Sequence, residues 1–139
     1  DDEVIRKVAD SGGLIGLVGF PAFVGPGDAP SLDAFLAHAD HLVKIAGHDH
    51  IGLGIDHYQG QHGISSPEQA KAMYDQLVAA GTWSAAYPPP PWKYPAGIDL
   101  PEKLPNLTHA LVKRGWTEPN IRKLLGENWV RVFRDVWGG

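Results

Sequence analysis

The segment from His50 to Asp56 constrains the fold of this chain more than any other. Its aliphatic residues Ile51, Leu53 and Ile55 alternate with two glycines and with Asp56. Because successive strand residues point to opposite faces, the pattern predicts a short buried strand that ends in a carboxylate. In barrels of alternating parallel strands and helices, catalytic groups lie at that end of the strands. Asp56 is therefore a candidate acid/base or substrate anchor, and the alternative is an aspartate that caps the following turn.

A second strand and a helix precede this segment. Residues 14–20 form a continuous apolar run, which is typical of a strand buried on both faces. Residues 31–46 begin with the potential cap Ser31, repeat apolar residues at helical spacing and stop at Gly47. A strand, a crossover helix and a second strand form a βαβ unit, which implies parallel pairing. The sequence therefore predicts the α/β class.

Helical spacing, caps and proline content predict the remaining elements. Asn106, Thr117 and Asn128 are the expected N-caps of the three last helices. The predicted elements are a helix over 2–11, a loop over 21–30, a capped helix from Ser66 to Gly81, a rigid extended segment over 87–95, and helices near 106–114, 118–125 and 128–136.

Length and composition set limits on the protein class. The 139 residues suit one domain and fall short of the roughly 250 residues of a complete (β/α)8 barrel. No apolar run approaches the ~20 residues of a membrane span, so we expect a soluble protein with no membrane span. The absence of cysteine excludes disulfides and thiolate metal sites.

Charge is distributed unevenly along the chain. Residues 1–100 carry five Lys/Arg against twelve Asp/Glu, whereas residues 101–139 carry seven against four. A basic helical tail can bind nucleic acid. The apolar content of this tail instead favours docking against a larger body, and we expect no nucleic-acid partner.

Histidines are the only candidate nitrogen ligands for a metal. His48 and His50 lie in the turn before the 50–55 strand and at its N-terminal end, which is the wrong end for barrel chemistry, and we assign no metal ligand in this chain. His57 and His62 follow Asp56, so either could line a site or exchange protons.

The proline-rich segment from Tyr87 to Pro95 allows two interpretations. Polyproline segments are ligands of partner domains, which would make the chain a non-enzymatic interaction module. The aromatic residues between the prolines instead suggest a lid that packs on its own chain beside a pocket.

Six segments together share a pattern with one known family. They are residues 12–17 with 20–23, 50–56, 87–97, 105–108, 114–117 and 125–133. In these segments the chain resembles the membrane dipeptidase (renal dipeptidase) family, the M19 metallopeptidases, over essentially its whole length. The resemblance implies that residues 1–139 are a single partial domain, the C-terminal portion of a (β/α)8 TIM-type barrel. It also implies a dipeptide substrate and a pair of zinc ions, whose ligands lie on earlier strands. The isolated chain should therefore be inactive.

Site residues follow from the resemblance position by position. Asp56 matches the family's acid/base aspartate at the end of the last strand. Phe20 and Phe23 match the neighbourhood of a substrate-lining loop, and His57 stands where an aromatic residue is common, so these three are expected to bind substrate. The expected partners are the rest of the barrel or a second copy of the chain in a homodimer. The expected compartment is the bacterial cytoplasm or periplasm.

Overall fold

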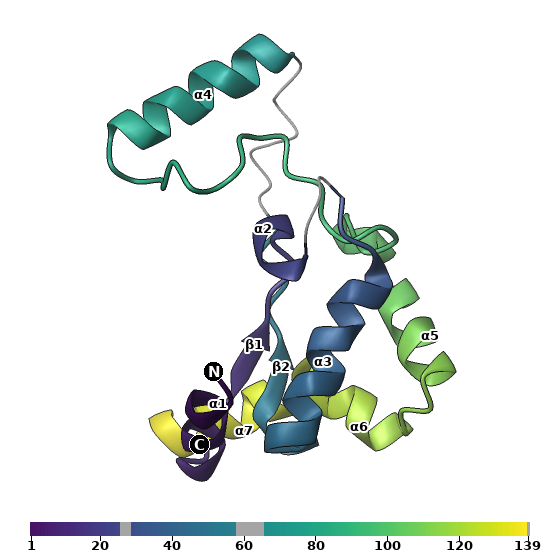
Figure 1. The fold of residues 1–139 in the computed structure, drawn as a ribbon. Helices are drawn as coiled ribbons and strands as arrows, with labels where there is room; N and C mark the ends of the chain where they lie inside the picture. The colour runs from purple at the N-terminus through teal and green to yellow at the C-terminus, as the bar shows by residue number, and fades with distance from the viewer. Residues whose placement is uncertain (26–28, 58–65, 139) are drawn as a thin grey trace.

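The computed structural model describes residues 1–25, 29–57 and 66–138. Its centre is a pair of parallel strands, β1 (Ile15–Leu17) and β2 (Ile51–Leu53), connected through helix α3 (Leu32–Ala46) (Figure 1). The strands pair in register, with Gly16 opposite Gly52. This confirms the predicted βαβ unit and the α/β class. The complete barrel remains a prediction, because the described residues form two strands.

Both strands are shorter than their apolar patterns predicted. The chain before β2 forms a 3-10 turn, η1 (His48–His50), so the strand begins only at Ile51. Main-chain hydrogen bonding nevertheless continues beyond the strands, from Gly54 N to Leu17 O at 3.1 Å and from Gly19 N to Ile55 O at 3.0 Å. The two segments therefore stay side by side as far as the residues that precede Phe20 and Asp56.

Helix α3 forms as predicted and covers β2. The Ser31 hydroxyl caps it by accepting a hydrogen bond from Ala34 N at 3.0 Å. Its apolar stripe buries Phe35, Leu36 and Ala39, which belong to the same core as Ile51. Burial of one large aliphatic or aromatic side chain contributes about 1.5–3 kcal/mol, so this stripe is a main source of the unit's stability.

The N-terminal third contains two further helices. Helix α1 (Asp2–Asp10) packs against α3, where His41 Nε2 lies 3.0 Å from Asp2 Oδ1. Helix α2 (Pro21–Val24) occupies part of the stretch predicted as a loop, so that prediction was wrong for these residues. Proline at the first helical position has a helical φ and needs no hydrogen bond there, which allows one turn to form.

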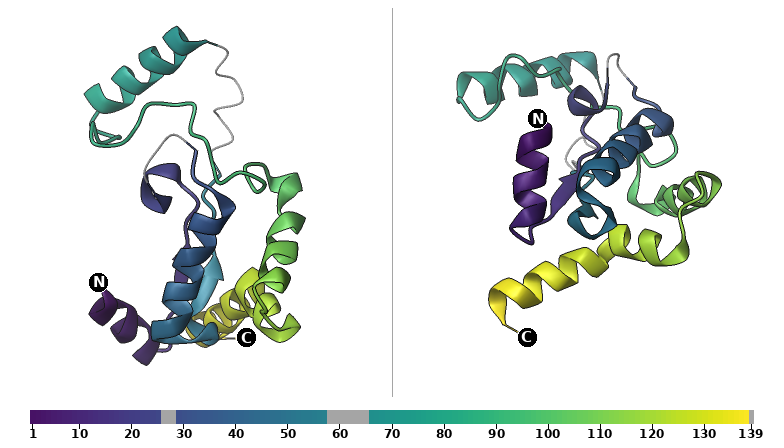
Figure 2. Two further views of the ribbon diagram at one scale, coloured as in Figure 1. Left: turned by 45° about the vertical axis from the view of Figure 1, so that its right-hand side comes forward. Right: turned by 60° about the horizontal axis from the view of Figure 1, so that its bottom comes forward.

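Helix α4 (Pro67–Ala79) projects from the body that holds the strands (Figures 1 and 2). The Ser66 hydroxyl accepts from Gln69 N at 3.2 Å, which confirms the predicted cap. The chain then returns along α4, and the Tyr74 hydroxyl donates to Ala85 O at 3.1 Å and Tyr87 O at 3.2 Å. These bonds fasten the start of the proline-rich segment to α4.

The C-terminal elements are η3 (Pro101–Lys103), α5 (Pro105–Lys113), α6 (Glu118–Arg122), the segment η4 (Lys123–Glu127) and α7 (Asn128–Trp137). The chain kinks within η4 at Gly126, whose backbone angles are not helical. Two expected caps have other roles. Asn106 is inside α5, and its amide donates to Gly97 O at 2.8 Å. Asn128 is buried, and its amide donates to His48 O and Ile51 O, each at 2.7 Å. Thr117 occupies the cap position of α6 without a capping side-chain bond.

The tail docks on the strands through one indole ring. Trp129 Nε1 donates to Leu53 O at 3.0 Å. A Cβ atom added to Gly52 would lie 2.6 Å from the same nitrogen, and one added to Gly16 would lie 3.6 Å from the ring. The glycines of the paired positions thus leave the space that Trp129 fills.

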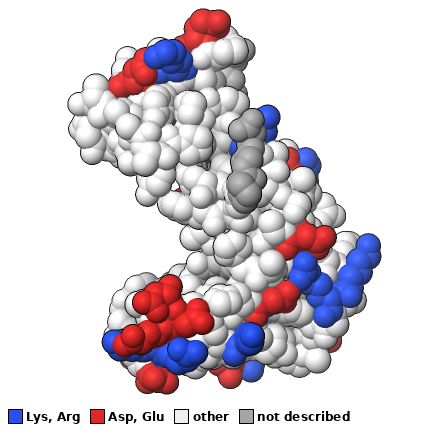
Figure 3. Space-filling model, viewed as in Figure 1, with Lys and Arg blue, Asp and Glu red and all other residues white. Residues whose placement is uncertain are grey.

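Basic residues of the tail pair with acids of the body. Arg114 bonds to Asp33 at 2.8 Å and to Asp40, and Lys123 bonds to Asp49 at 2.5 Å. On the face drawn in Figure 3, positive and negative side chains lie beside one another over the lower part of the molecule. This pairing supports docking of the tail. No helix within the described ranges is both long and apolar enough to cross a membrane.

Candidate functional site

The C-terminal ends of the two strands bring Phe20 and Asp56 to the same edge. Each follows directly after a residue of the hydrogen-bonded pair Gly19 and Ile55. Asp56 is exposed and has a φ of 65°, the one positive value among non-glycine residues of the described chain. Its carboxylate makes no hydrogen bond or ion pair with any other described residue, so it is available to a bound molecule. A carboxylate in that position can accept and return a proton.

His57 lies next to Asp56 with its ring held in place. Its Nε2 is 2.9 Å from the carbonyl oxygen of Ile98, and its ring meets Tyr94 edge to face at a centroid distance of 5.0 Å. A carbonyl oxygen only accepts, so Nε2 carries the proton and Nδ1 is the acceptor of the neutral ring. The second candidate of this stretch, His62, lies outside the described residues.

Phe20 and Phe23 belong to one aromatic cluster. Phe20 is only 4% exposed, and its ring lies 5.4 Å from Phe23 and 5.7 Å from both Trp83 and Trp92. Phe23 is 52% exposed and contacts Tyr87 at 5.5 Å. Phe23 can therefore present its ring to a ligand, whereas Phe20 supports it from within the core.

The proline-rich segment 87–95 packs onto this cluster. Trp92 and Tyr94 are buried, and Trp92 Nε1 donates to Pro88 O at 2.9 Å. These contacts match the predicted self-packing lid, and they leave the two buried rings inaccessible to a partner domain. A cavity of 480 Å³ lies between α2 and the segment. It is lined by Pro21, Ala22, Gly25, Pro88, Pro89, Pro91, Trp92 and Lys93.

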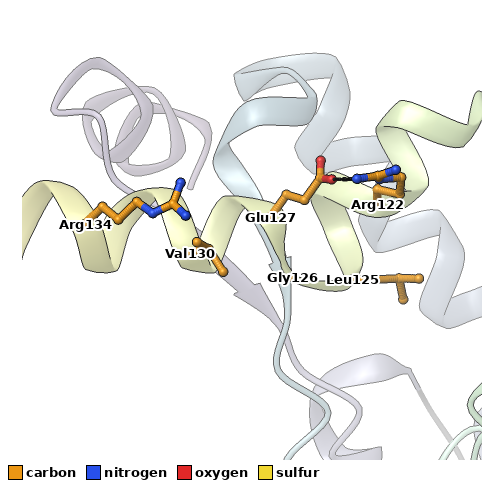
Figure 4. A pocket seen from close by; sticks show the side chains of 6 residues that line it. All are labelled: Arg122, Leu125, Gly126, Glu127, Val130 and Arg134. Carbon is orange, nitrogen blue, oxygen red and sulfur yellow. Dashed lines mark hydrogen bonds and ion pairs between the residues drawn. The ribbon is translucent and has the colours of Figure 1, made fainter. Parts of the chain in front are cut away.

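A larger groove of 690 Å³ lies on the tail, apart from the strand ends. It follows α6 and α7, with Leu125 and Val130 on one side and the Arg122–Glu127 ion pair, 2.6 Å long, on the other (Figure 4). Arg134 completes the lining. The groove combines apolar side chains with the charged residues Arg122, Glu127 and Arg134.

The described residues do not fit a resident metal ion. Within the ranges that the structure describes, no three His, Asp or Glu side chains come together as ligands. His50 Nδ1 lies 2.9 Å from Gly13 O, and His38 Nε2 lies 2.9 Å from Val24 O. His48 packs edge-on against Trp116 at 4.6 Å. These histidines are engaged in the structure of the chain.

Tyr94 is the site residue that the sequence did not single out. Its hydroxyl donates to the main-chain oxygen of Asp56, across a sequence separation of 38 residues. The only signal in the sequence was the set of aromatic residues between prolines, which predicts packing and not the partner of a particular hydroxyl.

Comparisons with known proteins identify the family of the chain. The sequence profile of "Membrane dipeptidase (Peptidase family M19)" matches residues 1–87 and 92–137. An amidohydrolase of known structure from Pseudomonas aeruginosa is 33% identical, with a TM-score of 0.80 over 99% of this chain and 40% of its own. A metallopeptidase from Rhodobacter sphaeroides, solved with a phosphinate mimic of the dipeptide L-Ala-D-Ala, is 25% identical, with a TM-score of 0.70 over 98% of this chain and 31% of its own.

A curated relative is matched over a similar share of its own length. The "Uncharacterized protein in pqqA 5′region" of Klebsiella pneumoniae is 29% identical over 140 residues, which are 98% of this chain and 40% of that protein. The chain thus spans less than half the length of the relatives that it matches. Together with the parallel strands and the carboxylate at their C-terminal end, the family match leads to one conclusion: the chain belongs to the M19 family of membrane dipeptidases.

Proposed function

We propose that this chain is the C-terminal part of a zinc-dependent dipeptidase and that Asp56 is its acid/base. The single observation that carries the proposal is the exposed Asp56 carboxylate at the C-terminal end of β2, in a chain of the M19 family. That position is where (β/α)8 enzymes place catalytic groups. The alternative, an aspartate that caps the following turn, concerns residues 58–65, which lie outside the described residues, and the Asp56→Asn variant tests it.

Peptide hydrolysis requires a group that moves one proton. As water adds to the carbonyl carbon, its proton passes to the Asp56 carboxylate. The resulting acid then gives that proton to the amide nitrogen as the C–N bond breaks, which releases an amine and a carboxylic acid. Asp56 ends the cycle ionised. General acid–base groups of this kind contribute typically 10²–10⁴-fold to the rate.

The aromatic cluster supplies the wall of the proposed substrate site. Phe23 is the exposed ring of α2, the helix whose residues Pro21 and Ala22 line the 480 Å³ cavity, and His57 follows Asp56. The Rhodobacter sphaeroides relative was solved with a mimic of L-Ala-D-Ala. Small dipeptides, including those with a D-residue, are therefore the substrates to test first.

The zinc ligands are proposed to come from outside the described residues, since those present do not form a metal site. An exposed apolar face on α7 supports the proposal that another part of the protein packs there. Phe133 and Trp137 are 41% and 74% exposed, and their rings stack at 4.6 Å. The rest of the barrel, or a second copy of the chain, is proposed to cover this face.

The test compares the product of the complete gene with the isolated chain 1–139. We expect the gene product to hydrolyse L-Ala-D-Ala, to lose activity on chelation and to regain it with zinc. The isolated chain should bind no zinc tightly and should be inactive. Hydrolysis that survives complete removal of metal, or a gene product inactive on every dipeptide tried, would contradict the proposal.

A further inference from the structure

The backbone of Asp56 has a conformation that needs support. A φ of 65° lies in the left-handed region, which costs a non-glycine residue roughly 1 kcal/mol or more. The main-chain bond from Gly19 N to Ile55 O is the last one before this residue. Asp56 thus stands beyond the strand ladder, and the direction of its carboxylate depends on contacts from elsewhere.

Those contacts come from one segment, residues 94–98. The hydroxyl of Tyr94 donates to Asp56 O, and Ile98 O accepts from His57 Nε2 at 2.9 Å. The rings of Tyr94 and His57 also pack against each other at 5.0 Å. Two consecutive residues, Asp56 and His57, are therefore held by two side-chain-to-main-chain bonds and one ring contact.

The segment that provides these contacts is itself anchored. Tyr94 is 3% exposed and Ile98 is fully buried. Ala96 N donates to Pro30 O at 3.1 Å, and Gly97 O accepts from the Asn106 amide at 2.8 Å. The Tyr94 hydroxyl consequently reaches Asp56 from a support that is fixed to the start of α3 on one side and to α5 on the other.

We infer that Tyr94 is a positioning residue for Asp56, which it orients through the main-chain oxygen without touching substrate. The inference rests on the proposed role of Asp56. Loss of the hydroxyl removes the side-chain bond to Asp56 O, so the carboxylate spends less time in the orientation that transfers the proton. A misplacement of about 1 Å in an active site can cost on the order of 100-fold in rate.

The variant Tyr94→Phe in the complete gene product tests the role, because it removes one oxygen and keeps the buried ring. Tyr74→Phe is the matched control, since Tyr74 also donates its hydroxyl to main-chain oxygens of the proline-rich region. We expect Tyr94→Phe to lower kcat for L-Ala-D-Ala by roughly 10- to 100-fold, with little change in KM or zinc content. The kcat of Tyr74→Phe should stay close to that of the unsubstituted protein. Values are expressed per folded molecule, counted by size-exclusion chromatography.

A double-mutant cycle separates positioning from general destabilisation. Added to Asp56→Asn, Tyr94→Phe should cause almost no further loss, because the group that it orients no longer exchanges a proton. An equal loss in both backgrounds, or equal kcat values for Tyr94→Phe and Tyr74→Phe, would overturn the positioning role and leave the dipeptidase proposal intact. A normal kcat for Asp56→Asn would instead overturn the role of Asp56 and that of Tyr94 with it.

Discussion

The side-chain amide of Asn128 donates a hydrogen bond of 2.7 Å to the carbonyl oxygen of Ile51, the first residue of β2. A second bond of the same length reaches His48 O. Asn128 is 3% exposed, and its bond to Ile51 O is buried, whereas its bond to His48 O is partly buried. The Asn128 side chain therefore joins the start of α7 to β2, the strand that leads to Asp56.

We expect Asn128→Ala to lower the free energy of unfolding by about 1–3 kcal/mol, because it removes the side-chain donor to the buried carbonyl oxygen of Ile51. Asn106→Ala is the control. It removes a bond of 2.8 Å to Gly97 O at an exposed residue, where water can replace the amide. Urea unfolding of both variants measures the difference. A larger loss for Asn106→Ala would show that the tail is not held in this way.

The two glycines of one strand pair should differ in their tolerance of a methyl group. A Cβ on Gly52 would lie 2.6 Å from Trp129 Nε1, whereas a Cβ on Gly16 would have ordinary contact at 3.6 Å. The indole cannot retreat easily, since it also bonds to Leu53 O. We expect Gly52→Ala to destabilise the protein by about 1–3 kcal/mol and Gly16→Ala by much less. Equal Tm values for the two variants would contradict the placement of Trp129.

His48 should make stability depend on pH. Burial lowers the pKa of His48, nearby Lys123 lowers it further, and Asp49 opposes the shift. The unfolded chain therefore takes up this proton at a higher pH than the folded chain. Its contribution to stability is fully present above the ordinary histidine pKa of about 6.5 and is lost as pH falls through the lower folded value.

The variant His48→Gln checks this prediction. We expect the free energy of unfolding of the unsubstituted protein to fall between about pH 7 and pH 5, and His48→Gln to reduce that slope. His109→Gln is a suitable control, because His109 is exposed and makes no hydrogen bond or ion pair with another described residue. An unchanged slope in His48→Gln would show that another group is responsible.

Local patterns were sufficient to predict the elements that position the site. Which residues are buried determines the alternation from Ile51 to Asp56 and the apolar stripe of α3. The βαβ unit and the candidate carboxylate could therefore be predicted from the sequence. Strand ends were less predictable. The 3-10 turn at His48–His50 replaces the start of β2, because Asn128 and Arg131 bond to main-chain oxygens of this stretch.

Long-range partners explain what the sequence did not predict. Asn128 has the residue type and spacing of a cap, but the chain kinks at Gly126, two residues earlier, and the Asn128 amide bonds to Ile51 O of β2 instead. Tyr94 was counted among packing aromatics, and its bond to Asp56 depends on where the proline-rich segment crosses the strand ends. Neither relationship is encoded within a short window of sequence.

The most direct test of the central claim is kcat for dipeptide hydrolysis by Asp56→Asn in the complete gene product. Asparagine keeps the size of the side chain but cannot accept and return the proton. We expect kcat to fall about 10²–10⁴-fold, with zinc content and Tm unchanged. Asp10→Asn, at an exposed carboxylate that ends α1 at the opposite end of β1, should retain normal turnover. A near-normal kcat for Asp56→Asn would contradict the catalytic role, and loss of zinc would make Asp56 a metal ligand instead.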